Sequence, residues 1–195
     1  MIFAKNPVLG TAKTRLAASV GDEKALEIYQ FLLQHTANLA AASDSDKRVF
    51  YSSYTESGDA FSEEYFTKTL QIEGDLGEKM YAGFQVALKD NYNRVVIIGS
   101  DCYELSTEIL NQAFEALLSN DFVIGPAKDG GYYLLGMRQL EPAIFQNKTW
   151  SHEGLYQATI ADFKALKYSF MELPLLSDVD YLEDLPQEVR TKFGV

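Results

Sequence analysis

Short apolar runs alternate with stretches of helical periodicity over the first two thirds of the chain. Runs rich in β-branched and apolar residues predict strands over 2–5, 48–53, 69–72, 94–99 and 122–125. Apolar residues at i, i+3 and i+4 predict helices over 24–41, 79–88 and 107–118. Strands that alternate with helices need crossover connections, so we expect a mainly parallel sheet with helices on both faces.

The last third departs from this alternation. A strand predicted over 132–137 directly follows the one at 122–125, and the Asp129-Gly130-Gly131 turn between them favours a hairpin. Further along, the pattern predicts elements as follows: a helix over 153–166, a strand over 168–172 and a terminal helix over 181–193. The run 94–99 is almost continuously apolar, which is typical of a strand buried on both faces, so we expect it at the centre of the sheet.

Length and composition limit the class of protein. The chain has 195 residues, of which 47% are hydrophobic, enough for one substantial core. We expect a single domain over 1–195. With 17 Lys+Arg against 28 Asp+Glu and a net charge of −11, the chain lacks the basic footprint that nucleic acid or an anionic membrane requires.

Cysteine usage and hydropathy indicate the compartment. The single cysteine, Cys102, excludes an intramolecular disulfide. No stretch approaches the length of a membrane span, and the N-terminus lacks the charged-then-apolar layout of a signal peptide. We therefore expect a cytoplasmic protein whose ligand is a small anion rather than a polyanion.

Basic residues concentrate just after the first predicted strand. Lys5, Lys13 and Arg15 surround a turn that contains Pro7 and Gly10 and leads into a helix. Free backbone N–H groups and a helix start favour anions, so this loop is a candidate phosphate site. A solvated basic helix start has the same pattern, since the loop lacks the second glycine of a Walker motif. It also lacks Gly-x-Gly-x-x-Gly, which disfavours a nicotinamide or flavin enzyme.

Carboxylates follow the central strand and precede the last predicted helix. Ligands of open α/β sheets bind outside the carboxyl ends of the strands, where Asp101 is expected. Its oxygen atoms suit Mg²⁺ or Mn²⁺ bridging two phosphates, although an aspartate there also caps turns. Asp178 and Asp180 lie near the end of the chain. They fit either an N-cap or a second set of metal ligands.

Three weaker signals concern the remaining loops. Gly130 and Gly131 would let the backbone approach a ligand closely, and Asp129 beside them is the candidate general base for an acceptor hydroxyl. The glycines of segment 74–79 fit either a ligand contact or a strand-to-helix turn with an aspartate near the cap. The Trp150-Ser151-His152 segment could line an acceptor site with an aromatic wall.

Five motifs together carry a resemblance to a known family. In chain order they read FAKNPVLGTAKTRL, GSDC, GPAKDGGYYLLGM, TWS and DVDYLEDL. Over essentially the whole chain they resemble a family of small bacterial GT-A-like proteins that are described as uncharacterised proteins or as glycosyltransferases, and sometimes as selenodomain-associated transferases. That family is similar to the nucleotide-diphospho-sugar transferase superfamily. The resemblance implies a GT-A-like, Rossmann-type three-layer α/β/α sandwich with a mainly parallel central sheet.

The resemblance also implies roles for residues. Gly10, Lys13 and Arg15 would bind nucleotide phosphates, Asp101 would be the metal-binding acid that replaces an Asp-x-Asp motif, and Asp180 a second ligand. The GDLGEKM segment resembles the part that holds the base or ribose. The nucleotide-binding residues that we expect are Ala4, Lys5, Pro7, Gly10, Lys13, Arg15, Gly74, Gly77, Ser100, Gly130 and Gly131. The chain departs from the family in having Tyr103 for a common proline and Tyr181-Leu182 for Thr-Pro.

These observations favour a metal-dependent glycosyltransferase that uses a nucleotide-sugar donor and a small-molecule acceptor. Mg²⁺ or Mn²⁺ on Asp101 and Asp180, together with Lys13 and Arg15, would neutralise the leaving diphosphate, and Asp129 would be the base. Two alternatives stay open. One is a nucleotidyltransferase that moves a nucleoside monophosphate from a triphosphate to a phosphorylated small molecule. The other is a nucleotide-binding protein without turnover.

Overall fold

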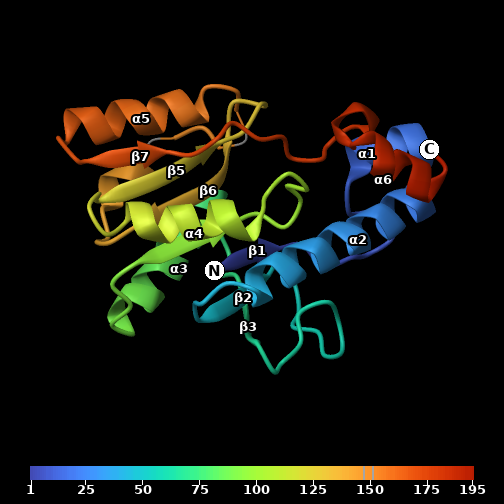
Figure 1. The fold of residues 1–195 in the computed structure, drawn as a ribbon, viewed down its shortest axis with the longest axis horizontal. Helices are drawn as coiled ribbons and strands as arrows, with labels where there is room; N and C mark the ends of the chain where they lie inside the picture. Colours follow the sequence, from blue (N-terminus) through green and yellow to red (C-terminus); the bar gives the residue numbers. More distant parts are fainter. Residues whose placement is uncertain (147, 151) are drawn as a thin grey trace.

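The computed structural model describes residues 1–146, 148–150 and 152–195, and within them seven strands form one sheet in the order β3-β2-β1-β4-β6-β5-β7 (Figure 1). The strands are β1 (Ile2–Ala4), β2 (Lys47–Tyr51), β3 (Phe66–Leu70), β4 (Val95–Ile98), β5 (Phe122–Pro126), β6 (Tyr132–Met137) and β7 (Phe170–Glu172). β4 holds the central place expected from its apolar run. The predicted hairpin is confirmed, but β6 inserts between β4 and β5 and runs antiparallel to both, while the other pairs are parallel.

Two pairs of helices cover the two faces of the sheet. The helices are α2 (Asp22–Ala41), α3 (Leu76–Lys89), α4 (Thr107–Ala116) and α5 (Leu155–Ala165). Side chains of α2 and α4, such as Leu33 and Leu110, pack with Val49 and Val96 on one face. The apolar sides of α3 and α5 form a separate core with the opposite face of β4, β5 and β6. The expected mainly parallel α/β/α sandwich is therefore confirmed.

A third apolar cluster lies at one end of the molecule. There α1 (Thr14–Val20) and α6 (Gln187–Phe193) lie beside the N-terminal half of α2 (Figure 1). Leu16, Ile28 and Val189, one from each helix, are buried together. This cluster brings the loop after β1 and the last loop of the chain to the same place, although they are far apart in sequence.

The predicted terminal helix over 181–193 is wrong in its first half. A 3₁₀ turn, η2 (Leu182–Asp184), is followed by an extended Leu185, and α6 begins only at Gln187. Pro186 explains the break, because proline disfavours helical geometry at the preceding residue and lacks an N–H.

The predicted strand over 69–72 is placed too late. β3 instead spans Phe66–Leu70, because buried Phe66 packs against Phe61, whereas Ile72 is exposed.

Helix starts show which loop residues have a structural role. Ser106 caps α4, since its Oγ accepts a hydrogen bond from Ile109 N at 3.3 Å. Asp75 and Glu78 form a capping box at the start of α3, each accepting from the other's backbone N–H at 2.8 Å. Another short 3₁₀ helix, η1 (Pro142–Phe145), packs against α3 and α5. Among the described residues no helix is long and apolar enough to cross a bilayer.

Candidate functional site

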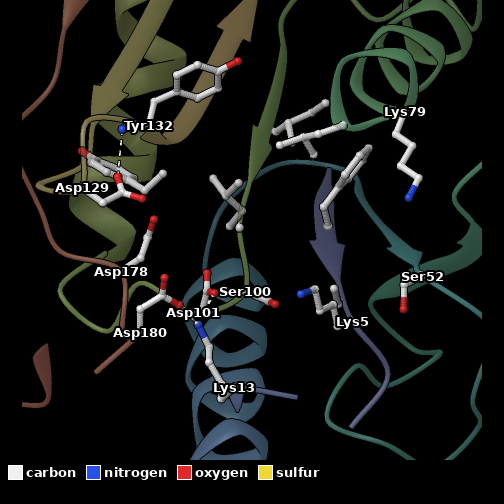
Figure 2. Close-up of a pocket in the computed structure, with 18 of the residues that line it drawn as sticks. Lys5, Lys13, Ser52, Lys79, Ser100, Asp101, Asp129, Tyr132, Asp178 and Asp180 are labelled. Atoms are coloured by element: carbon white, nitrogen blue, oxygen red, sulfur yellow. Dashed lines mark hydrogen bonds and ion pairs between the residues drawn. The ribbon is translucent and has the colours of Figure 1, made fainter. Parts of the chain in front are cut away.

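A cavity of about 640 Å³ opens at the carboxyl ends of β1 and β4, the edge where the sequence places its polar loops. Nine of the residues expected in the site line this cavity. They are Ala4, Lys5, Lys13, Arg15, Ser100, Asp101, Asp129, Gly131 and Asp180. The loop after β1, the loop after β4, the β5–β6 turn and the last loop of the chain thus contribute to one pocket (Figure 2).

Five other expected residues, Pro7, Gly10, Gly74, Gly77 and Gly130, do not line the cavity. Packing accounts for two of these glycines. A Cβ on Gly77 would lie 2.1 Å from the Trp150 ring, so this glycine accommodates the indole. Gly74 has a φ of +128°, and a Cβ there would meet the Glu78 side chain of the capping box. The GDLGEKM segment instead reaches the cavity through Leu76, Lys79 and Met80.

Lys13 is the electrostatic centre of the pocket. Its Nζ lies 2.5 Å from Asp101 Oδ2 and 3.2 Å from Asp180 Oδ1. The Lys13 side chain is only 7% exposed, whereas those of Asp101 and Asp180 are 31% and 34% exposed. Arg15 Nη1 donates to the second oxygen of Asp180 at 2.6 Å. The cations expected to bind phosphate and the acids expected to bind metal therefore contact one another.

The ion pairs shift the ionisation of both partners. Burial alone would lower the pKa of Lys13, but the carboxylates of Asp101 and Asp180 outweigh burial and leave that pKa raised. Burial would likewise raise the pKa of Asp180, and Lys13 and Arg15 reverse this and hold it below its usual range. Both groups stay charged at neutral pH, so the pocket contains fixed charges of both signs.

Asp178 is a third carboxylate at the site. Its side chain points toward Asp129 (Figure 2), and it lines the cavity. Its Oδ1 is buried without a hydrogen-bond partner among the described residues. Burial, followed by the charges of Asp101 and Asp129, raises the pKa of the Asp178 carboxyl well above its usual range. The sequence pointed to the pair Asp178 and Asp180 but did not single out Asp178.

The N-cap interpretation of Asp178 and Asp180 is wrong. The side chain of Asp184 accepts the backbone N–H groups of Asp180 and Tyr181, at 3.0 and 2.7 Å, and so closes the turn that contains η2. α6 begins after Pro186 with no side-chain cap. Because Asp184 has the local role, the carboxylates of Asp178 and Asp180 both face the pocket.

Asp129 is held by the turn between β5 and β6. Its Oδ1 accepts the N–H of Gly131 at 2.8 Å. Gly130 has a φ of +86°, and a Cβ there would lie 1.9 Å from the Glu153 carbonyl oxygen, so the turn packs tightly on the segment before α5. In the predicted aromatic wall, Trp150 packs on Gly77, and Ser151 lies outside the described residues.

Tyr29 of α2 connects two loops of the site, a role that the sequence did not reveal. Its hydroxyl accepts from Lys5 N and donates to Lys5 O, both at 3.0 Å, and lies 3.2 Å from Ser100 Oγ. Lys5, Ser52 and Lys79 line the end of the cavity away from the carboxylates (Figure 2). The pocket therefore has charges of both signs at the aspartate end and two further lysines, Lys5 and Lys79, at the other.

The donor set can be tested against a divalent metal. Among the described residues, no group of three or more His, Cys, Asp or Glu side chains is arranged to hold a metal ion. Mg²⁺, however, is commonly held by one or two carboxylates together with substrate phosphates. Asp101 and Asp180 are partly exposed carboxylates, and Asp178 has a buried oxygen that no described residue contacts by a hydrogen bond. These residues fit a metal that completes its coordination on phosphate.

Solved structures share this architecture. A "putative nucleotide-diphospho-sugar transferase" from Desulfovibrio desulfuricans G20 is 32% identical, with a TM-score of 0.88 over 98% of this chain and 85% of that chain. CMP:2-keto-3-deoxy-manno-octonic acid synthetase, complexed with CTP, is 11% identical, with a TM-score of 0.56 over 99% and 96% of the two chains. Rv0371C from Mycobacterium tuberculosis H37Rv, in complex with manganese, is 12% identical, with a TM-score of 0.51 over 94% and 93%. The two distant structures show likeness of fold alone.

The family assignment agrees with the resemblance carried by the motifs. No curated protein sequence matches the chain. Residues 34–152 match the bacterial family described as "Uncharacterized protein conserved in bacteria (DUF2064)", a span that includes the central strand, Asp101 and the β5–β6 turn. With the nucleotide-diphospho-sugar transferase fold and this match, the chain belongs to the DUF2064 family of bacterial proteins.

Proposed function

We propose that the protein is a metal-dependent glycosyltransferase that takes its sugar from a nucleotide-diphosphate donor. The observation that carries the proposal is the cluster of Lys13, Arg15, Asp101 and Asp180 in one cavity at the carboxyl ends of β1 and β4. The relative of known structure that is 32% identical has a matching description, a nucleotide-diphospho-sugar transferase. Cations beside acids suit a diphosphate and its metal.

Charge neutralisation would be the main catalytic contribution. In glycosyl transfer the acceptor hydroxyl attacks the anomeric carbon, the bond to the diphosphate breaks, and the nucleoside diphosphate leaves with an additional negative charge. Lys13 and Arg15 are the cations beside which that charge would develop. Asp101 and Asp180 would hold Mg²⁺ or Mn²⁺, which supplies Lewis-acid stabilisation of the leaving diphosphate when bound.

The acceptor needs a base, and we assign that role to Asp129. Its carboxylate lines the cavity, and the hydrogen bond from Gly131 fixes its direction. Asp129 would take the proton of the acceptor hydroxyl as the new glycosidic bond forms. Asp178 lies between Asp129 and the Lys13 cluster (Figure 2) and is the second carboxylate within reach of an acceptor.

Nucleotidyl transfer is the second candidate, and the basic loop favours it. Lys13 and Arg15 within three positions of one another suit a triphosphate, whose α-phosphate would be attacked while pyrophosphate leaves. The two reactions release different products. Free nucleoside diphosphate from a nucleotide sugar indicates glycosyl transfer, whereas pyrophosphate from a nucleoside triphosphate indicates nucleotidyl transfer.

A thermal-shift screen of nucleotides and nucleotide sugars, with and without Mn²⁺, tests the proposal first, because a selective ligand stabilises the folded state by mass action. Lys13→Ala should abolish the shift, while Lys24→Ala, at an exposed pair with Glu27, should preserve it. The stabilising ligand is then incubated with enzyme and the released phosphate species are identified. No shift with any nucleotide contradicts the proposal, and binding without turnover indicates a non-catalytic binding protein.

A further inference from the structure

Lys13 occupies the position that a metal on the two acids would need. Its ammonium lies at hydrogen-bond distance from both Asp101 and Asp180 and is almost fully buried. A divalent ion on the same two oxygens would lie next to this positive charge. Repulsion between cations at such a distance is strong in a partly buried site. The ammonium and the metal therefore compete for Asp101 and Asp180.

A donor phosphate in the cavity would offer Lys13 an alternative partner. Lys13 belongs to the loop after β1 and lines the cavity in which the donor phosphates are proposed to lie. Its ammonium stands on a flexible four-carbon stem, so it can turn from a carboxylate to a phosphate while the backbone stays in place. Asp180 would still have Arg15 at 2.6 Å. The departure of Lys13 therefore leaves Asp180 paired and frees one oxygen on each acid.

We propose that Lys13 is an internal cation that neutralises Asp101 and Asp180 in the free protein, moves to phosphate when the donor enters, and thereby makes metal binding depend on phosphate binding. The inference rests on the proposed function, since it assumes that a diphosphate and a divalent metal share this pocket. It adds a dependence to that function: the metal binds weakly on its own and tightly only when a diphosphate is bound. Lys13 acts here as a positioning residue for the metal.

The backbone of Lys13 determines the choice of variants. Lys13 has φ 52° and ψ 47°, the left-handed region, at the start of α1. Lys13→Met removes the ammonium and keeps most of the side-chain volume. Lys13→Gly removes the ammonium and suits the left-handed backbone, so it protects the test if the methionine variant folds poorly. Lys24→Met is the matched control, because it deletes a positive charge that pairs with Glu27 and does not line the cavity.

The experiment measures Mn²⁺ binding by electron paramagnetic resonance, together with the shift in Tm, first with Mn²⁺ alone and then with Mn²⁺ and inorganic pyrophosphate. Wild type and Lys24→Met should bind Mn²⁺ weakly alone and at least about tenfold more tightly with pyrophosphate, a typical coupling between sites. Lys13→Met and Lys13→Gly should bind Mn²⁺ alone at least about tenfold more tightly than wild type. Mn²⁺ alone should raise the Tm of these two variants only.

Two results would overturn the inference, and they differ in what they say about the proposed function. Equal Mn²⁺ affinity of wild type and both Lys13 variants without pyrophosphate removes the competition but leaves a metal-dependent transferase intact. No Mn²⁺ binding by any of the proteins, even with pyrophosphate, removes the inference and the metal dependence of the proposed function together.

Discussion

Lys13 and Lys68 are both buried lysines that lie between two acids, yet their surroundings differ. Lys68 Nζ donates to Asp59 Oδ1 and Glu63 Oε1, both at 2.8 Å, and to the Glu56 carbonyl at 2.6 Å. Asp59 also accepts from the Tyr51 hydroxyl at 2.5 Å. Every donor of this ammonium has a partner, and the network ties the loop after β2 to β2 and β3.

The network around Lys13 is open by comparison. Its acids, about one third exposed, line a cavity, whereas Asp59 is 18% exposed and Glu63, at 58%, faces solvent at the rim of its network. The neighbouring Asp178 also keeps an oxygen without a partner among the described residues. A closed network stabilises the fold, whereas an open one retains charge for a ligand. Lysine paired with two acids thus has a structural role beside the edge strand β3 and a proposed binding role at the carboxyl ends of the inner strands β1 and β4.

The largest expected effect is a difference in transfer rate between variants of Asp101 and of Asp59. Asp101→Asn should lower the transfer rate by about 100-fold or more, because it removes a carboxylate that would hold the metal needed to neutralise the leaving diphosphate. Asp59→Asn should lower stability and leave the transfer rate of the folded protein nearly unchanged. Steady-state assays at a temperature well below both Tm values measure the difference. Similar rate losses in the two variants would contradict the division into structural and functional clusters.

For stability, we expect the larger loss at Lys68 and the smaller one at Lys13. Lys68→Met leaves the Asp59 carboxylate, which is 18% exposed, without a cation and with only the Tyr51 hydroxyl and Phe61 N–H as donors, which should cost up to about 3 kcal/mol of the free energy of unfolding. Lys13→Met should cost less, because Asp101 and Asp180 are accessible to water and Arg15 remains. Urea unfolding of both variants tests the order. A larger loss at Lys13 would indicate that its cluster mainly stabilises the fold.

The position of the cluster around Lys13 could be predicted from the sequence only in part. The apolar run before Asp101 predicted a central strand, and the rule that ligands meet the carboxyl ends of strands then placed Asp101 beside the loop of Lys13. The pairing itself was beyond a sequence argument, because Lys13 and Asp180 are 167 positions apart and meet through an irregular loop. The choice between Asp178 and Asp180 depended on Asp184, whose capping role is set by η2.

The fold shows the same limit. Local patterns predicted the β5–β6 hairpin, but the insertion of β6 between β4 and β5 is a long-range choice that no local pattern records. The break before α6 had a local signal in Pro186 that the apolar periodicity of 181–193 masked. Helices and strands with a clear hydrophobic periodicity could therefore be predicted. For the loops that build the site, only their succession along the chain could be predicted, not their contacts.

Two glycines sharpen the comparison at the level of the backbone. Gly130, beside Asp129, and Gly58, beside Asp59, have φ values of +86° and +73°. Gly58→Ala has open space and should cost about 1 kcal/mol for the left-handed backbone. Gly130→Ala should cost about 2–3 kcal/mol, because its Cβ would overlap the Glu153 carbonyl and force the turn to move. Thermal unfolding measures both.

The turn at Gly130 also positions the proposed base. Gly130→Ala should therefore reduce the transfer rate, since Asp129 would shift with the backbone, while Gly58→Ala should leave the rate unchanged. Equal stability losses without a rate effect at Gly130 would show that the close approach to Glu153 is not required for the site.

The smallest expected effect concerns the exposed edge of the structural cluster. The hydrogen bond from Lys68 lowers the pKa of Glu63 below its ordinary value of 4.5. The folded state therefore binds fewer protons than the unfolded state between the two pKa values, so stability from this pair is present above 4.5 and is lost as the pH falls through the lowered pKa. Glu63→Gln should have a slightly lower Tm than wild type at neutral pH. This difference in Tm should disappear in acid, where Glu63 is protonated and neutral like glutamine. A gap that persists in acid would show that Glu63 contributes through its packing, in which case the network around Lys68 would remain closed without that charge.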